Sequence, residues 1–578
     1  MIRLSIWIMI ILGHLILFAG CQKPSSDDAL IPDQNGKITF ANKVISIEID
    51  PSTKMNFTFR KGEKNLSLLV PAGETLQTPH TLIVNGEVVD DFLMQTDKTR
   101  LAEVQTEFGA GKLLQVYAVS TDNLQQTIQK ELQITLLEKY PDLALIKAVY
   151  TNLHPQQTLV IEQINSNVFQ LDRRQVNSGE VPHNFWNFSG FGKIIGGKHQ
   201  NIRVNVLPIS ADTDIPNNSE EISGVPLVDI WAPEMGMAIA CIEKRAHILK
   251  MPVKVDKERI VNISIIESPE IILKSGESFS AVNTAVIFHS LDYFNPLNRY
   301  AQLMADQGMV PKPCPDFGYA PFWCNWGYRT EWSLEHGLDR LDEFKALGIK
   351  TITIDDGWFD EYGDWYASPR RFPGGDEQLR EWVEKIHAAG LKVVFWWVPG
   401  IGGPRTAEEH PEWLILDKSG EKISIHWKNS FMLCPSLPEV VEHHRKLTEK
   451  FISEYGFDGF KMDGIYVAPR CYNPAHHHAD PAESYADYED IFKAIYETAM
   501  RLKPEGDFVL GMCPCGSFCS PYYLQWGNRP VTADPPQRAL TTRYRVKAYK
   551  ALLGPQSSVD NDFRERYNDY FPVEFGCG

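Results

Sequence analysis

The sequence Thr351-Ile352-Thr353-Ile354-Asp355-Asp356-Gly357-Trp358 indicates how the second half of the chain folds. Its first four residues form a β-branched run that is typical of a buried strand, and an amphipathic helix is expected after it, over residues 376–389. The same order of short apolar strand and helix recurs along residues 316–578. Further helices are expected over residues 334–347, 439–455 and 485–501.

This alternation predicts eight strands. They cover residues 322–324, 351–354, 392–396, 459–462, 508–511, 530–532, 557–559 and 571–575. Regular alternation of strand and helix predicts a parallel sheet, and eight units over about 260 residues fit a closed (β/α)8 TIM barrel. No helix is predicted after the last strand, so we expect either a truncated terminus or a partner that covers this flank.

Short runs of alternating apolar and polar residues fill the chain before residue 290. Examples are residues 43–50, 132–136, 157–164 and 260–266. This two-residue period is typical of strands with one buried face. The pattern predicts a large antiparallel β-domain of two packed sheets over residues 37–290, followed by a linker over residues 291–315.

The composition is that of a large, acidic, globular protein. The 578 residues are 43% hydrophobic and 23% charged, and 57 basic against 74 acidic residues give a net charge of −17. Nucleic acid is also negatively charged, so we expect no nucleic-acid partner. Ten cysteines in so long a chain do not indicate a disulfide scaffold. The composition therefore favours an enzyme or a binding protein.

The N-terminus resembles an export signal. Arg3 precedes an apolar run, and Phe18-Ala19-Gly20-Cys21 resembles the box at which bacterial lipoproteins are cleaved and lipidated. We expect a signal peptide over residues 1–20, a lipid anchor on Cys21 and a tether over residues 21–36. This predicts an exported cell-envelope lipoprotein, in the periplasm or outer membrane of a Gram-negative bacterium. The alternative is an ordinary signal peptide with an accidental cysteine.

Carboxylates and tryptophans gather at the predicted strand ends, where TIM-barrel enzymes place their active sites. Carboxylates accept hydrogen bonds from sugar hydroxyls, and indole rings can stack on the apolar face of a pyranose. Eleven of the 14 tryptophans lie within residues 323–526. Any one residue could be structural, with Asp355 as a helix cap or Trp397 in the core, but the joint pattern favours a carbohydrate pocket. The residues are Asp355 and Asp356 after the second strand, Trp396 in the third, Lys461 and Asp463 at the fourth, and Asp534 after the sixth.

Five motifs together resemble glycoside hydrolase family 36, the clan D family of α-galactosidases and α-N-acetylgalactosaminidases. Their order and spacing agree with that family over roughly residues 316–578. The resemblance implies that the preceding β-domain is a β-supersandwich, and that the family's C-terminal β-domain is absent here. The motifs are Asp355-Asp356-Gly357-Trp358-Phe359, His410-Pro411-Glu412-Trp413, Pro438-Glu439-Val440, Tyr455-Gly456-Phe457-Asp458 and Lys461-Met462-Asp463.

The resemblance implies a retaining mechanism and assigns roles to the candidate residues. Asp463 would be the nucleophile, and Asp534 the general acid and base. Lys461 lies two residues before Asp463, on the same side of the strand, and would help keep it ionised. The substrate-binding residues would be Asp355 and Asp356 on the hydroxyls, Trp358 and Trp396 as pocket walls, Lys461, and Cys513, Gly516 and Ser517 after the fifth strand.

The chain departs from the family pattern at several places, which leaves the substrate open. Val398-Pro399-Gly400 replaces a run that carries carboxylates in the family, and Gly464-Ile465 replaces an Asn-Arg pair. An exported α-galactosidase-like hydrolase is the leading hypothesis. The alternatives are an α-N-acetylgalactosaminidase, a transglycosylase and a non-catalytic sugar-binding lipoprotein, although retention of both Asp463 and Asp534 argues against the last.

Two clusters raise the question of a metal. His476-His477-His478-Ala479-Asp480 contains suitable ligands, but adjacent histidines on a loop are not expected to face one ion. Cys513, Cys515 and Cys519 resemble a thiolate site only loosely, and no second cysteine pair at zinc-ribbon spacing accompanies them. We therefore expect no metal and no cofactor.

Overall fold

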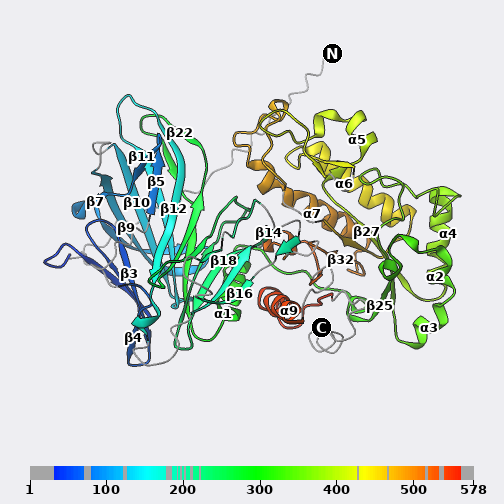
Figure 1. The fold of residues 1–578 in the computed structure, drawn as a ribbon, viewed down its shortest axis with the longest axis horizontal. Coiled ribbons are helices and arrows are strands. Elements are labelled where there is room, and N and C mark those ends of the chain that lie inside the picture. Colours follow the sequence, from blue (N-terminus) through cyan, green and yellow to red (C-terminus); the bar gives the residue numbers. More distant parts are fainter. Residues whose placement is uncertain are drawn as a thin grey trace, which may run out of the picture.

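The computed structural model separates into a part made mostly of sheets and a part in which helices surround a parallel sheet (Figure 1). The described residues are 32–70, 80–121, 127–176, 185–191, 193–195, 198–200, 203–207, 213–215, 217–220, 223–425, 429–464, 468–514, 518–532 and 539–560. The expected signal peptide and Cys21 lie outside them. No helix among these residues is long and apolar enough to cross a membrane.

Two large antiparallel sheets and one smaller sheet build the first part. The largest sheet contains β7 (Phe92–Met94), β8 (Arg100–Thr106), β9 (Gly109–Ser120), β10 (Ile128–Leu137), β11 (Leu143–Asn152), β13 (Phe185–Phe191), β16 (Arg203–Leu207), β18 (Gly224–Trp231), β19 (Gly236–Cys241), β23 (Ser278–Ser280) and β24 (Thr284–His289). The second contains β5 (His80–Val84), β6 (Glu87–Val89), β12 (Leu159–Leu171), β17 (Thr213–Ile215), β20 (Val253–Val255), β21 (Val261–Glu267) and β22 (Ile271–Leu273). The smaller sheet contains β1 (Ile38–Ala41), β2 (Ile45–Ile49), β3 (Met55–Lys61) and β4 (Lys64–Leu66), and β14 (Lys193–Ile195) pairs with β15 (Lys198–Gln200).

Alternation along the strands explains how these sheets pack. Residues of β10 alternate between buried and partly exposed positions, because successive side chains of a strand point to opposite faces. One apolar core joins all three sheets, with Ile134 from the largest, Ile263 from the second and Phe57 from the smallest. The first part is thus built mostly of antiparallel sheets, as predicted, although a third, smaller sheet joins the two that were expected.

The second part is built on a curled sheet of parallel strands, and neighbouring strands come in chain order. A parallel bridge between Val531 and Asp560 continues the sheet toward the predicted seventh strand. The predicted eighth strand, residues 571–575, lies outside the described residues. The sheet contains β25 (Phe322–Cys324), β26 (Thr351–Ile354), β27 (Lys392–Trp397), β31 (Gly459–Met462), β32 (Val509–Met512) and β33 (Arg529–Pro530); β28 (Ile401–Gly402), β29 (Ser424–Ile425) and β30 (Ser430–Met432) form a small separate sheet.

Helices follow the parallel strands as the alternation predicts. The helix expected over residues 334–347 is divided in two, and the one expected over residues 439–455 ends in a π-helical segment, Lys450–Glu454. The helices are α2 (Leu334–Leu338), α3 (Leu341–Ala346), α4 (Gly375–Ala388), α5 (Pro404–Glu409), α6 (Pro438–Glu449), α7 (Glu483–Leu502), α8 (Pro521–Leu524) and α9 (Ala539–Leu553).

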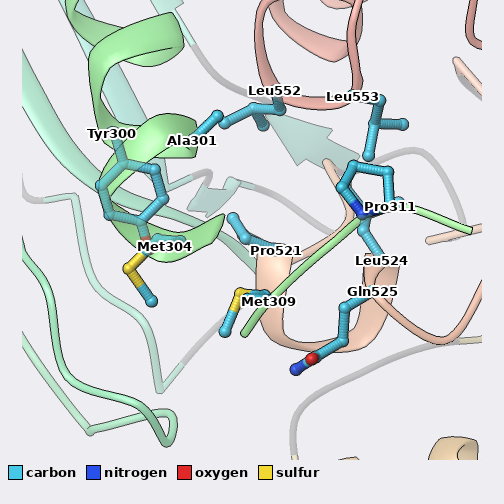
Figure 2. A pocket seen from close by; sticks show the side chains of 10 residues that line it. All are labelled: Tyr300, Ala301, Met304, Met309, Pro311, Pro521, Leu524, Gln525, Leu552 and Leu553. Atoms are coloured by element: carbon cyan, nitrogen blue, oxygen red, sulfur yellow. The ribbon is translucent and has the colours of Figure 1, made fainter. Parts of the chain in front are cut away.

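A helix occupies the interval that was expected to be a linker. In α1 (Phe294–Asp306), Leu297, Tyr300, Leu303 and Met304 are buried, at the three- and four-residue spacing of one helical face. This face packs near α8 and α9, where a pocket of only about 30 Å³ remains (Figure 2). So small a volume has room for at most a few water molecules, so we assign no ligand to this pocket.

Candidate active site

Parallel register brings the predicted site residues to one edge of the sheet. Ile354 of β26 pairs with Phe395 of β27, and Trp396 of β27 pairs with Lys461 of β31. Residues just beyond these pairs therefore leave the sheet on the same side. This edge collects Asp355, Asp356, Trp396, Lys461 and Asp463, which the sequence analysis singled out separately.

A buried ion pair lies at the centre of the site. The Lys461 Nζ donates to the Asp355 Oδ2 at 2.8 Å, and the two side chains are only 4% and 5% exposed. The Cys324 Sγ lies 3.3 Å from the same oxygen, and the Asp355 backbone N–H donates to the Asn325 Oδ1 at 2.6 Å. These contacts fix Asp355 in place, and the Lys461 ammonium balances the negative charge of the Asp355 carboxylate.

Asp463 is buried and accepts two hydrogen bonds. The Trp396 Nε1–H donates to its Oδ2 at 2.7 Å, and the Gly464 N–H donates to its Oδ1 at 2.6 Å. The pKa of Asp463 is raised above its usual value, chiefly by burial and also by the charge of Asp355, although the Lys461 ammonium and the Trp396 hydrogen bond act in the opposite direction. The surroundings thus hold this carboxylate in one orientation and oppose part of the cost of keeping it ionised.

Asp356 is held by a tyrosine that the sequence analysis did not identify. The Tyr362 hydroxyl lies 2.6 Å and 2.7 Å from the two carboxylate oxygens of Asp356. Burial, followed by the charge of Asp356, raises the pKa of Tyr362, so the phenol stays a donor at neutral pH. Tyr362 follows Asp356 by six residues, and no spacing rule marks it as a partner.

The two tryptophans assigned to the pocket walls lie in different surroundings. Trp358 is fully buried, its rings contact Phe395 and Phe457, and its Nε1–H donates to the Trp396 carbonyl oxygen at 2.8 Å. This placement fits a core residue, whereas the sequence analysis assigned Trp358 to the pocket. Trp396 is almost fully buried, stacks on Phe359 and touches the site through its indole N–H.

The remaining predicted site residues divide between described and undescribed parts of the chain. Cys513 is buried directly after β32, and its backbone N–H donates to the Met462 carbonyl oxygen at 2.7 Å, one residue before Asp463. Asp534, Gly516 and Ser517 lie outside the described residues. Cys513 is thus placed beside the carboxylate cluster by the sheet itself.

The part of the chain that carries the parallel sheet matches known catalytic domains. Residues 311–511 match the family described as the glycosyl hydrolases family 31 TIM-barrel domain. Over 411 residues the chain is 29% identical to the A type blood α-D-galactosamine galactosaminidase of Flavonifractor plautii, covering 68% of this chain and 37% of that protein. Over 118 residues it is 34% identical to a probable α-galactosidase C of Aspergillus flavus, covering 18% of this chain and 15% of that protein. The chain carries a glycosidase domain.

Solved structures share the fold of this glycosidase domain and of the sheets before it. The galactosidase domain of an α-galactosidase–sucrose kinase matches with a TM-score of 0.58 at 14% identity, covering 91% of this chain and 78% of that one. A family 36 α-galactosidase of Geobacillus stearothermophilus, bound to 1-deoxygalactonojirimycin, matches with a TM-score of 0.55 at 14% identity, covering 90% of this chain and 77% of that one. The predicted resemblance to family 36 is therefore confirmed for the fold, although the matching family model is that of family 31.

Proposed function

We propose that residues 316–578 form a (β/α)8 barrel that hydrolyses terminal α-galactosides with retention of configuration. The observation that carries this proposal is the environment of Asp463, a buried carboxylate at the end of β31 that accepts hydrogen bonds from Trp396 and Gly464. A nucleophile needs a fixed orientation and an ionised state. The two donors fix the orientation, and together with the Lys461 charge they oppose the burial that raises the pKa of Asp463.

In the first step, Asp463 attacks the anomeric carbon while Asp534 protonates the departing oxygen. In the second, Asp534 takes a proton from water, and the water breaks the glycosyl ester on Asp463. Lys461, Asp355 and Asp356 bind sugar hydroxyls, because the ion pair offers both a donor and acceptors at the edge beside Asp463.

A second candidate substrate is an α-galactosaminide. It is favoured by the galactosaminidase of Flavonifractor plautii, whose match spans 68% of this chain. The chain spans little more than a third of that relative, so the activity of the whole relative does not transfer directly. Val398-Pro399-Gly400 also removes a carboxylate that the family pattern would place near the sugar.

Hydrolysis of three aryl glycosides would test the proposal: the α-galactoside, the N-acetyl-α-galactosaminide and the α-galactosaminide. We expect turnover of at least one of them. Asp463→Ala should abolish this turnover while its unfolding transition stays that of the wild type. The control is Asp342→Ala, which removes a carboxylate that is 98% exposed and pairs with Lys345 along its own helix. No turnover of any of the three by the folded protein would favour the non-catalytic sugar-binding alternative, and transfer to added sugars in preference to water would favour the transglycosylase.

We also propose that the protein is exported and anchored through Cys21. The apolar segment and the box Phe18-Ala19-Gly20-Cys21 support this. Growth with labelled palmitate should mark the wild type and not Cys21→Ser. Recovery of unlabelled protein with Met1 retained would contradict the anchor.

A further inference from the structure

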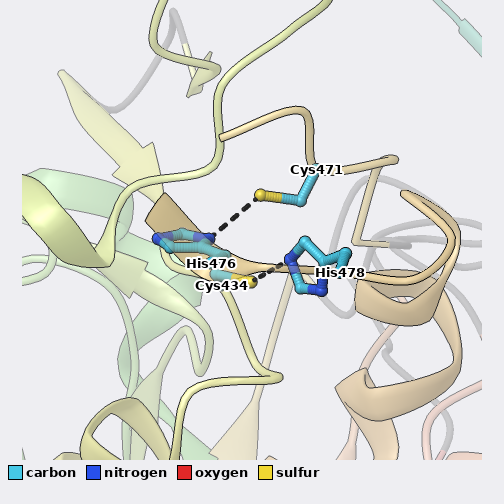
Figure 3. Close-up of side chains that lie close together, drawn as sticks. All are labelled: Cys434, Cys471, His476 and His478. Carbon is cyan, nitrogen blue, oxygen red and sulfur yellow. Dashed lines mark hydrogen bonds between the residues drawn. The ribbon is translucent and has the colours of Figure 1, made fainter. Parts of the chain in front are cut away.

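Two cysteines and two histidines converge on one point beside the sheet (Figure 3). Their ligand atoms, the sulfurs of Cys434 and Cys471 and one nitrogen each of His476 and His478, all lie within 4.8 Å of one another. Cys434 follows β30, in the long segment between β27 and α6, and the other three residues lie between β31 and α7. The cluster therefore joins two loops that both leave the sheet at the edge carrying Asp463.

The backbone between the two histidines explains how both can face the cluster. His477 adopts a left-handed conformation with φ of 54°, and its own side chain is exposed. The chain thus presents the first and third histidines inward and turns the second away. Sequence reasoning expected adjacent histidines not to share an ion, and it did not connect them with Cys434 or Cys471.

Each inward imidazole is held from behind by an oxygen. The His476 Nδ1 lies 3.2 Å from the Cys471 Sγ, and its Nε2 lies 2.6 Å from the Glu412 carbonyl oxygen. The His478 Nε2 lies 3.4 Å from the Cys434 Sγ, and its Nδ1 lies 3.2 Å from the Glu483 Oε2. A metal-ligating histidine usually has one ring nitrogen facing the metal and the other hydrogen-bonded to a carbonyl or carboxylate oxygen.

The donor set selects the kind of ion. Both cysteines are buried and neither is in a disulfide. Two sulfurs and two imidazole nitrogens suit Zn²⁺ in tetrahedral coordination, whereas Ca²⁺ and Mg²⁺ require oxygen ligands. Four protein ligands fill a tetrahedral shell, which is the composition of a structural site and not of a catalytic one.

We propose that Cys434, Cys471, His476 and His478 bind a structural zinc ion that ties the loop after β27 to the loop after β31. Neighbouring bonds link the same two loops, since the Asn473 side-chain amide donates to the Leu414 carbonyl oxygen at 3.0 Å and the Tyr472 N–H donates to the Leu416 carbonyl oxygen at 2.9 Å. The ion would fix the loop that begins directly after Asp463. This inference does not depend on the identity of the substrate.

The first test is the metal content of the full-length protein, measured by inductively coupled plasma mass spectrometry after exposure to zinc and removal of excess. We expect one zinc per chain in the wild type and in the control His477→Ala, whose side chain points away. Loss of a ligand in Cys434→Ser, Cys471→Ser, His476→Ala or His478→Ala should weaken zinc binding by more than about 100-fold. Glu483→Gln, which alters only the support of His478, should weaken it by about 10- to 100-fold.

Cobalt substitution provides a spectroscopic test that a folding defect cannot imitate. Tetrahedral Co²⁺ with two thiolates should give intense visible bands and a sulfur-to-metal charge-transfer band in wild type and in His477→Ala, weakened in Cys471→Ser. Chelation should lower the Tm of wild type and His477→Ala but not of Cys434→Ser. Three results would overturn the proposal: no bound zinc in the folded wild type, zinc retained in the cysteine variants, or a Cys434–Cys471 disulfide found by peptide mass mapping.

Discussion

Trp396→Phe should move the acidic limb of the pH profile of activity. The substitution removes the 2.7 Å hydrogen bond from the indole Nε1–H to the Asp463 Oδ2, while the phenyl ring keeps an aromatic face against Phe359. That bond favours the ionised carboxylate and so lowers the pKa of Asp463, against the burial that raises it. Its loss makes the Asp463 carboxyl group harder to ionise.

The size of the effect follows from the charge on the acceptor. A hydrogen bond to a charged group contributes about 1.5–3 kcal/mol. Because about 1.4 kcal/mol corresponds to one pH unit, the acidic limb of kcat/KM should move up by about one to two units. The plateau at higher pH should change less, since the Gly464 N–H still holds the Asp463 Oδ1 at 2.6 Å.

The assay measures kcat/KM on an aryl α-galactoside across the pH range in which the protein stays folded. Trp397→Phe is the matched control, because its ring packs against Phe451 and Phe460 and its indole nitrogen has no hydrogen-bond partner among the described residues. We expect this control to leave the limb in place. Equal profiles for wild type and Trp396→Phe would refute the link between this bond and the reacting carboxylate.

Three further predictions concern the ion pair, a buried histidine and the general acid. Lys461→Met should lower the free energy of unfolding, measured in urea, by about 3–5 kcal/mol, because it leaves Asp355 charged and buried without its partner. Adding Asp355→Leu should recover most of this loss, and no recovery would refute the pairing. Burial lowers the pKa of His444 from 6.5 to about 3, so the unfolded chain takes up a proton that the folded chain does not. The free energy of unfolding should therefore fall by about 1.4 kcal/mol per pH unit as the pH drops from 6.5 to about 3, and His444→Gln should weaken this slope; an unchanged slope would contradict the prediction. Asp534→Ala should slow oligosaccharide hydrolysis by about 100-fold or more but galactosyl fluoride hydrolysis far less, whereas a uniform loss would reject Asp534 as the acid.

The strands could be predicted closely because each is a short apolar run that ends at polar or turn residues. Phe322–Cys324, Thr351–Ile354 and Gly459–Met462 agree with the prediction at both ends. The helix α1 was missed, although Leu297, Tyr300 and Leu303 carry its buried face at helical spacing. The local sequence pattern was therefore enough to predict most of the strands and helices.

The site was predictable only where residues lie at the end of a strand or directly after it. Asp355 and Asp463 follow parallel strands of one sheet, so both lie at the same edge of the sheet, and the alternation of strands and helices already implies this parallel arrangement. Trp358 could not be placed in this way, because Gly357 adopts a φ of +99° and Trp358 beyond this bend lies in the aromatic core. The proximity of Cys434 to Cys471 could not be predicted either, because only tertiary structure brings together positions so far apart in the chain.

Covalent trapping would test directly whether Asp463 is the nucleophile of a retaining glycosidase. The protein would be inactivated with a fluorinated α-galactosyl fluoride, which forms a glycosyl ester that breaks down slowly, and then digested for peptide mass mapping. We expect one added sugar on the peptide that contains Asp463, and none in Asp463→Ala. A sugar attached to Asp355, Asp356 or another carboxylate, or turnover that releases the product with inverted configuration, would contradict it.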